Sequence, residues 1–376
     1  MKILYLVSWY KRPGSPNSGY FFYQLANGMK KYAETVVVLN VHVKFFAIID
    51  RIGVLENHED NLHEYTIFVP AIIPRWKWLY DKLGRIGASY MLKRIAKVHG
   101  NFDIIHVQSA LQAASYSEKY IREVDTPVIY TEHSSRILNG DLTKYELKAI
   151  NVMKDNAHCC FAVSKALCNK LKRYIPEVGV IGNIVDFDEC NAELLYDKTS
   201  AFTFVCLGTL RKDKGMLELI QAFSKEFDPH EEVKLLIGGE GEYREEILRE
   251  INNHPKHNIQ LLGEIPHNRV KNLLEVCDCF VLPSRYETFG IVYIEAMACG
   301  LPVIATKCGG PEEFVNKTNG ILVEVGNEIE LMDALRNMVI NHNRYDRSNI
   351  SKEILNQFSL DTVCKKYLAV YKKEII

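Results

Sequence analysis

The stretch that decides the fold is Pro283–Thr306, which reads PSRYETFGIVYIEAMACGLPVIAT. Its pattern predicts the end of a strand, a loop, a helix, a tight turn at Gly300 and a second strand. Two glutamates lie eight positions apart in it. Glu287 falls in the predicted loop, and Glu295 falls about one turn inside the predicted helix.

The start of this helix is a predicted anion site. Phe289, Gly290 and Ile291 offer backbone N–H groups that have no partner within the helix. The same end of a helix carries partial positive charge and therefore favours a phosphate. Because Glu287 and Glu295 flank this position, the stretch indicates a site for a sugar joined to a nucleoside diphosphate.

Outward from this stretch, short apolar runs alternate with helical segments in both directions. Strands are expected at Ile3–Val7, Thr35–Leu39, Asp103–Val107, Val128–Thr131, Ala157–Val163, Phe202–Leu207, Lys234–Ile237, Ile259–Leu262, Cys279–Leu282, Val303–Ala305 and Ile321–Val323. Such alternation predicts two doubly wound parallel sheets, each of the Rossmann-like α/β class. A polar stretch at 186–201 separates them, so we expect domains at 1–185 and 186–359, followed by an amphipathic helix at about 360–376.

Size and composition agree with two globular domains. The chain has 376 residues, of which 47% are hydrophobic and 25% charged, and no apolar run reaches the 18 residues that a membrane-spanning helix needs. The apolar segment after Lys2 lacks a small-residue cleavage site, so a buried first strand is favoured over a signal peptide. Ten scattered cysteines without a Cys-x-x-Cys pair favour reduced core cysteines in a cytoplasmic protein and give no indication of a metal site.

Charge is unevenly distributed along the chain. Residues 1–185 hold 24 Lys and Arg against 16 Asp and Glu, whereas residues 186–376 hold 22 against 31. A basic first half indicates an acidic partner, for which nucleic acid and an anionic membrane surface are the two candidates. No RNA- or DNA-binding motif accompanies the charge, which argues against nucleic acid.

Residues 71–100 combine basic and aromatic side chains. Seven basic residues stand there against one acidic residue, Asp81, and Trp76, Trp78, Tyr80 and Tyr90 are interleaved with them. Tryptophan, tyrosine and lysine suit a membrane interface. We therefore expect this segment to dock on the inner face of the cytoplasmic membrane. The alternative is a solvated basic helix whose aromatic rings pack on the sheet.

With these motifs in order, the chain resembles the retaining glycosyltransferases of family 4, the group 1 glycosyltransferases with the GT-B fold. The resemblance covers nearly the whole chain and is strongest from Phe204 to Val323, with the E-x₇-E stretch its most specific element. It implies two Rossmann-like domains facing across a cleft. The second would bind a UDP- or GDP-sugar and the first a glycan or lipid-linked acceptor, and the C-terminal helix would pack back on the first. The implied pathway is cell-surface polysaccharide or lipopolysaccharide synthesis.

The resemblance also implies roles for individual residues. Glu287 would lie by the donor sugar at the reacting centre and Glu295 would bind the ribose hydroxyls. Lys214 matches the phosphate-binding lysine, whereas Thr209 stands where the family has an arginine. Arg211 or Lys212 would replace that arginine. No metal or other cofactor is required, because basic groups and a helix N-terminus would stabilise the leaving diphosphate.

Further positions are carried over from the family in the same way. His133, at the end of a predicted strand, matches a histidine near the donor sugar, and we count it with Glu287 as catalytic. The remaining donor-binding positions are Gly19, Gly239, Glu264, Ile265, Phe289, Gly290 and Ile291. Gly19 belongs to a loop over the diphosphate, and Glu264 and Ile265 belong to a loop beside the base.

Four other functions compete with glycosyl transfer. A nucleotide-sugar epimerase or hydrolase can use the same fold. The substitution at Thr209 leaves room for a non-catalytic sugar-nucleotide-binding relative. A dehydrogenase is disfavoured because no G-x-G-x-x-G follows the first strand. A nucleic-acid-binding protein is suggested by charge alone.

Overall fold

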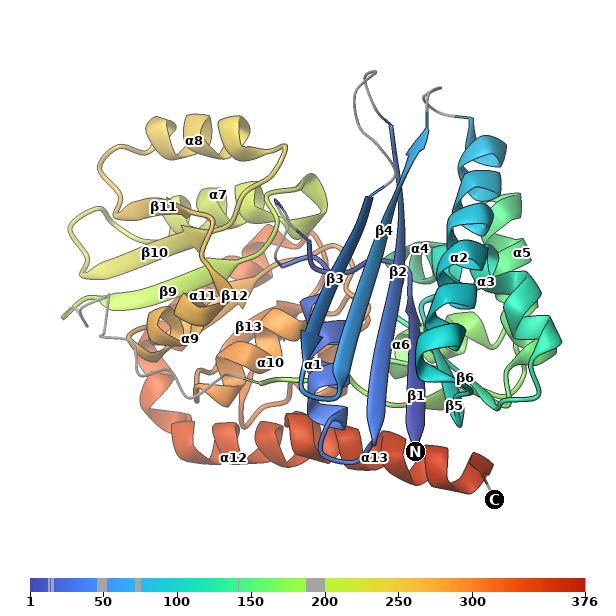
Figure 1. Cartoon of the computed structure of the whole chain (residues 1–376). Coiled ribbons are helices and arrows are strands. Elements are labelled where there is room, and N and C mark those ends of the chain that lie inside the picture. The colour runs from blue at the N-terminus through green and yellow to red at the C-terminus, as the bar shows by residue number, and fades with distance from the viewer. Residues whose placement is uncertain are drawn as a thin grey trace. The chain divides into compact units, whose positions relative to one another are not determined.

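A computed structural model describes residues 1–12, 14, 17–45, 53–71, 76–140, 142–186 and 200–375. The chain divides into two compact units (Figure 1). Unit 1 comprises Met1–Ile184 and Leu360–Ile376, and unit 2 comprises Val185–Ser359. The division lies one residue before the 185/186 boundary expected from sequence. Most of the polar stretch 186–201 lies outside the described residues.

Unit 1 is built on an eight-stranded sheet with the order β3-β4-β2-β1-β5-β6-β7-β8. Its strands are β1 (Lys2–Val7), β2 (Thr35–Phe45), β3 (Gly53–Glu59), β4 (Leu62–Ala71), β5 (Ile104–Gln108), β6 (Val128–Glu132), β7 (Cys159–Ala162) and β8 (Gly179–Val180). All pairs are parallel except β3 with β4. The strands of the parallel core were predicted from the sequence, but β3, β4 and the two-residue β8 were not.

Helices cover both faces of this sheet (Figure 1). They are α1 (Tyr20–Met29), α2 (Lys77–His99), α3 (Ala110–Glu123), α4 (Ser135–Asn139), α5 (Lys144–Asn156), α6 (Lys165–Leu171) and α13 (Leu360–Ile375). No helix in the described ranges is both long and apolar enough to cross a bilayer.

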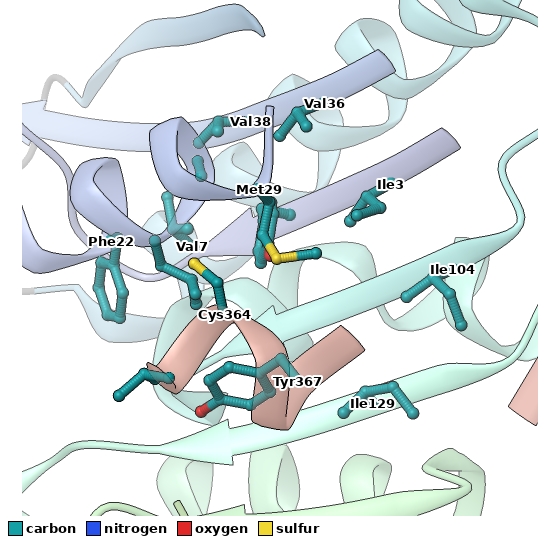
Figure 2. Close-up of a cluster of buried hydrophobic side chains, with 14 of the residues drawn as sticks. Ile3, Val7, Phe22, Met29, Val36, Val38, Ile104, Ile129, Cys364 and Tyr367 are labelled. Atoms are coloured by element: carbon teal, nitrogen blue, oxygen red, sulfur yellow. The ribbon is translucent and has the colours of Figure 1, made fainter. Parts of the chain in front are cut away.

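The central strand β1 sends alternate side chains into the core beneath α1 and α13. Ile3, Tyr5 and Val7 are at most 3% exposed and join one apolar cluster with residues of both helices (Figure 2). The two helices meet closely at Gly28, where an added Cβ would lie 2.7 Å from Cys364 Sγ. Burying each large apolar side chain of this kind stabilises a fold by about 1.5–3 kcal/mol. The end of the chain is therefore part of the core of unit 1.

Unit 2 is built on a six-stranded parallel sheet with the order β11-β10-β9-β12-β13-β14. Its strands are β9 (Phe202–Leu207), β10 (Val233–Gly238), β11 (Ile259–Gly263), β12 (Cys279–Leu282), β13 (Val303–Thr306) and β14 (Gly320–Val323). The first strand, β9, lies beside the fourth, β12. The order of strands reverses there, and ligands of open α/β sheets bind outside the carboxyl ends of the strands at such a point.

Helices connect the strands of unit 2. They are η1 (Lys212–Lys214), α7 (Met216–Glu226), α8 (Arg244–Asn253), α9 (His267–Glu275), α10 (Ile291–Ala298), η2 (Pro311–Glu313), α11 (Glu328–Asn341), η3 (His342–Arg344) and α12 (Arg347–Phe358). Two parallel-sheet α/β units are the fold class that the sequence predicted. The cysteines within the described ranges are free thiols.

Candidate active site

The two loops that leave β9 and β12 are joined at the carboxyl edge of the sheet of unit 2. The first loop runs from Gly208 to Gly215, and the second from Pro283 to Gly290. The backbone N–H of Arg285 donates to the backbone O of Asp213 at 2.8 Å, which fixes one loop against the other. The point where the strand order reverses is therefore lined by the two segments that the sequence analysis singled out.

Lys214 and Glu287 meet at this point. Lys214 Nζ lies 2.6 Å from Glu287 Oε1, and the side chains are only 20% and 11% exposed. Ser284 Oγ donates to the same carboxylate oxygen at 3.0 Å. A part-buried cation and carboxylate at the carboxyl ends of two strands can bind a phosphate and a sugar hydroxyl respectively.

The helix α10 begins at Ile291, four residues after Glu287. Gly290 is its N-cap with φ 92°, and no side chain of the described residues caps it. An added Cβ at Gly290 would lie 2.6 Å from the Tyr293 ring, so only glycine fits here. Phe289 is 1% exposed and packs against Phe314 and Phe358. Since none of Phe289, Gly290 and Ile291 has a polar side chain, any contact that they make with an anion comes from their main chain.

Glu295 lies in the second turn of α10, as the sequence predicted, and is 9% exposed. Its Oε1 is 3.3 Å from His267 Nε2 at the first position of α9. Glu264 and Ile265 belong to the loop just before this histidine, where Glu264 is exposed and Ile265 is half-buried. The structure thus brings Glu295 together with His267, the residue that follows this loop.

Gly239 holds three strand ends together. Its N–H donates to Gly263 O at 2.7 Å, and the N–H of Gly208 donates to Gly238 O at 3.1 Å. Gly239 has φ 144°, and an added Cβ would overlap Gly208 O. A side chain there would push apart the loops after β9 and β10, so a glycine at 239 allows the loop from Gly208 to Gly215 to lie close to the end of β10.

Arg211 takes a different position from Lys214. Its guanidinium Nε lies 2.8 Å from Asp213 Oδ1, and its side chain is 49% exposed. Lys212 is exposed as well. Neither side chain contacts the pair of Lys214 and Glu287 in the described structure, so the choice between them as the replacement for the arginine at Thr209 stays open.

Two of the candidate residues belong to unit 1. Gly19 is the N-cap of α1 with φ 64°, at the end of a loop in which 13, 15 and 16 are outside the described residues. His133 directly follows β6, and its Nε2 lies 2.7 Å from Gln108 Oε1. Its ring also packs against Phe21 and Phe22, with centroid distances of 5.0 and 4.9 Å.

Burial lowers the pKa of His133 from its ordinary value of 6.5 to about 3. The side chain of Asn183 opposes this lowering of the pKa, although no hydrogen bond of good geometry joins it to the ring Nδ1, which is buried. The imidazole is therefore neutral at physiological pH. In that form one ring nitrogen donates a hydrogen bond and the other accepts one.

Several residues in these clusters were not singled out from the sequence. They are Ser284, His267, Gln108 and Glu132. Ser284 stands within the quoted stretch, and Glu132 directly precedes His133, so their neighbours offered a signal. His267 and Gln108 lie 28 and 25 positions from their partners, and only the folded chain brings them there.

Comparison with known families gives two matches that follow one another along the chain. Residues 21–189 match the family described as Glycosyltransferase Family 4. Residues 194–353 match the family described as Glycosyl transferases group 1. Among curated relatives, an uncharacterized glycosyltransferase of Methanocaldococcus jannaschii, MJ1178, is 27% identical over 357 residues, which is 94% of this chain and 96% of the relative.

Solved structures share the fold at lower identity. Sucrose-phosphate synthase from Thermosynechococcus elongatus superposes with a TM-score of 0.80 at 18% identity, over 99% of each chain. The Anabaena protein Alr3699/HepE in complex with UDP-glucose gives a TM-score of 0.74 at 20% identity, over 99% of this chain and 100% of that one. Structures of this kind have the GT-B fold, which is therefore the fold of this chain.

Proposed function

Because the chain belongs to the group 1 glycosyltransferases of family 4, we propose that it transfers a sugar from a UDP- or GDP-sugar to a hydroxyl group of a glycan or lipid-linked acceptor. The anomeric configuration of the sugar is retained. The acceptor belongs to a cell-surface polysaccharide or lipopolysaccharide, and the enzyme works in the cytoplasm. One observation carries this proposal, namely the Lys214–Glu287 pair at the switch point of unit 2, beside the uncapped start of α10.

In this proposal the reaction depends on stabilisation of the leaving diphosphate. Its developing charge is stabilised by Lys214 and by the first N–H groups of α10, so no metal is needed. Glu287 binds the donor sugar and Glu295 binds the ribose hydroxyls. The bond from the anomeric carbon to the phosphate oxygen breaks while the acceptor oxygen attacks the same face. The departing phosphate takes the acceptor proton.

The neutral ring of His133 contributes hydrogen bonding to this scheme. A group with a pKa near 3 does not exchange protons at physiological pH. It is therefore suited to bind a sugar hydroxyl or the reacting oxygen rather than to act as a general acid or base.

The first experiment separates binding from turnover. UDP- and GDP-sugars are screened for thermal stabilisation of the full chain with EDTA present, because a ligand far above its Kd stabilises the native state by a few kcal/mol. Stabilising donors are then incubated with hydroxyl acceptors, and the anomer of each product is determined by NMR. Transfer with retention is expected. No stabilisation by any donor would contradict the proposal.

The same assay distinguishes the alternatives. Turnover of the donor without an acceptor, giving an epimer or a free sugar, would indicate an epimerase or hydrolase. Stabilisation without any turnover would indicate a non-catalytic relative. Stabilisation that is lost in EDTA and restored by a divalent cation would contradict the metal-independent mechanism.

We further propose that α2 docks unit 1 on an anionic membrane, near a lipid-linked acceptor. Trp76, Trp78 and Tyr90 are 49%, 52% and 57% exposed, so these rings do not pack on the sheet as the alternative would require. Ile86 is 57% exposed. The spacing of Trp78, Lys82, Ile86, Tyr90 and Lys97 puts them on one side of the helix.

The charges of α2 support the same surface. Arg85 is paired with Asp81 and Glu118, and Arg94 is paired with Glu56. Among the described residues, Lys82, Lys93 and Lys97 have no ion-pair partner and are exposed. Each lysine near an anionic surface contributes about 1 kcal/mol before screening.

Vesicle flotation tests this docking. Changing Lys82, Lys93 and Lys97 to Glu should abolish binding to vesicles that contain an anionic phospholipid, and wild type should not bind neutral vesicles. The matched control changes Lys172, Lys372 and Lys373 to Glu, three exposed lysines of unit 1 outside α2. Equal binding by both triple variants would overturn the docking surface without affecting the proposed transfer.

A further inference from the structure

Two buried polar residues bind His133. One contacts its ring and the other contacts its peptide N–H. Gln108, at the end of β5, is 1% exposed, and its Oε1 lies 2.7 Å from His133 Nε2. A carbonyl oxygen only accepts hydrogen bonds, so His133 Nε2 must carry the proton. Nδ1 then keeps its lone pair and is the nitrogen left to accept a hydrogen bond.

Gln108 is itself oriented by a second buried histidine. Its Nε2 lies 3.1 Å from His106 Nε2 and 3.4 Å from His106 Nδ1, and an amide nitrogen only donates. The shorter contact assigns the lone pair to His106 Nε2 and the proton to Nδ1, which lies 2.5 Å from Tyr371 Oη. Burial lowers the pKa of His106 well below its ordinary value, which keeps that ring neutral with a single proton.

The hydrogen bonds continue into the C-terminal helix. Tyr371 Oη lies 3.0 Å from Tyr5 Oη, and Thr131 Oγ1 lies 2.9 Å from His106 Nε2 and 3.1 Å from Tyr367 Oη. Both tyrosines of α13 are buried. A chain of neutral groups thus runs from α13 to His133, and each member limits the proton position of the next.

Glu132 holds the peptide group of His133. It is 0% exposed, and its carboxylate accepts five hydrogen bonds. Oε1 accepts from the N–H groups of His133 and Ser134, both at 2.7 Å, and from Ser109 Oγ at 2.6 Å. Oε2 accepts from the N–H of Ala110 at 3.2 Å and from Tyr130 Oη at 2.5 Å.

This carboxylate also joins the ends of β5 and β6. Ser109 follows β5 with φ 64°, a left-handed conformation that is unfavourable for a residue with a Cβ. Its hydroxyl is bound to Glu132 and its N–H donates to Thr131 O at 2.8 Å. A strained turn that persists only through such bonds is typical of a functional site.

We infer that Gln108 and Glu132 are positioning residues for His133. Gln108 fixes the ring as the Nε2–H tautomer, and Glu132 fixes the peptide that carries it. The inference rests on the proposed role of His133 at the donor sugar and makes that role more specific. With Nε2–H committed to Gln108, the nitrogen of the ring that remains to accept a hydrogen bond is Nδ1, which is buried beside Asn183.

Imidazole NMR tests the first half of the inference. The full chain is labelled with ¹⁵N-histidine, and His133 is assigned with His133→Asn. A protonated Nε2 and an unprotonated Nδ1 are expected in wild type. Gln108→Leu should move the ring signals toward a mixture of tautomers. Gln108→Glu keeps an oxygen facing His133 and should preserve Nε2–H. An Nδ1–H tautomer in wild type, or unchanged signals in Gln108→Leu, would overturn the role of Gln108.

Amide hydrogen exchange tests the second half. Glu132→Gln replaces one acceptor by a donor amide, so the His133 and Ser134 amides should exchange about tenfold faster. Ser109→Ala is the matched control, because it removes one donor to the same carboxylate but leaves both amides bound. Equal exchange in wild type and Glu132→Gln would contradict the role of Glu132.

Kinetics connect both halves to the proposed function. Gln108→Leu and Glu132→Gln should lower kcat while nucleotide Kd, which depends on unit 2, stays within about twofold. A fall in nucleotide affinity equal to the fall in kcat would indicate general misfolding and would sink the positioning role. The NMR and exchange results do not require activity. A chain without transferase activity but with the predicted tautomer would refute the proposed function alone.

Discussion

Lys214 and Glu287 form a part-buried ion pair with 2.6 Å between Nζ and Oε1. The two residues are 73 positions apart and come from the loops after β9 and β12. A diphosphate arriving at the start of α10 would compete for the ammonium group, and Glu287 would then be free to bind the sugar. In the proposed mechanism, binding of the donor and exchange of this ion pair would therefore be one event.

Replacing Lys214 by methionine should weaken nucleotide binding by about 30- to 150-fold. The change removes a charge-assisted hydrogen bond to phosphate, which is worth about 2–3 kcal/mol. Isothermal titration with UDP and GDP measures the effect. Lys256→Met, at an exposed lysine of unit 2 outside the two loops, is the control and should change the affinity less than threefold. Similar losses in both variants would show that only the total charge of unit 2 matters.

Gly290→Ala should destabilise the protein by about 2–4 kcal/mol, since it combines a φ of 92° with a Cβ 2.6 Å from the Tyr293 ring. Gly326→Ala shares the positive φ, at 75°, but its Cβ meets nothing within 4 Å. It should cost only about 1 kcal/mol. Calorimetric unfolding of both variants measures the difference. Equal shifts in the melting temperature would mean that the Tyr293 ring moves aside at no cost.

Acid should destabilise unit 1 through His133. Its pKa is about 3 in the native state and 6.5 in a free side chain, so below pH 6.5 the unfolded state binds a proton that the native state does not. The contribution of the neutral His133 side chain to the free energy of unfolding is fully present above pH 6.5. It is lost as the pH falls toward 3, at up to about 1.4 kcal/mol per pH unit.

Urea denaturation at pH 7 and pH 5 checks this contribution. The three tryptophans of the chain, Trp9, Trp76 and Trp78, all belong to unit 1, so their fluorescence follows that unit alone. Wild type should lose about 2 kcal/mol more than His133→Gln between the two pH values. His230→Gln, at an exposed histidine, should behave as wild type. A wild-type loss no larger than that of His133→Gln would contradict the lowered pKa.

Deleting residues 360–376 should unfold unit 1 and leave unit 2 folded. The deletion removes Cys364, Tyr367 and Tyr371, which are at most 2% exposed, from the core of unit 1. The cooperative tryptophan transition should disappear, while circular dichroism should retain a transition from unit 2. An intact tryptophan transition would show that α13 only covers a core that is already stable.

The sequence predicted most of the parallel strands of both units because each is a short apolar run flanked by turns, but it missed β4 and the two-residue β8, which also pair in parallel. It did not predict the hairpin of β3 and β4, whose outer strand is mostly half-buried or exposed and carries His58, Glu56 and Glu59 among its apolar residues. A strand at the edge of a sheet buries little, so apolar content does not mark it. The resemblance to the family was also weakest there.

The places of Gly290 and Glu295 in the fold could be predicted because they follow from the local sequence. Gly290 is the N-cap of α10 and Glu295 lies in its second turn, whereas their roles in binding a donor stay predictions. The side-chain partners of the candidate residues could not be predicted from the sequence. That Arg211 contacts Asp213, and that His267 approaches Glu295, depends on side-chain directions that no periodicity encodes.

The placement of α13 has a consequence for synthesis on the ribosome. Unit 2 is one continuous segment, Val185–Ser359, so its core is complete as soon as that segment has left the exit tunnel. Unit 1 is translated first but is completed last, because its core lacks Tyr367 and Tyr371 until they too have been translated. Nascent unit 1 exposes apolar surface throughout this delay, which makes it the part of the chain that most needs chaperones.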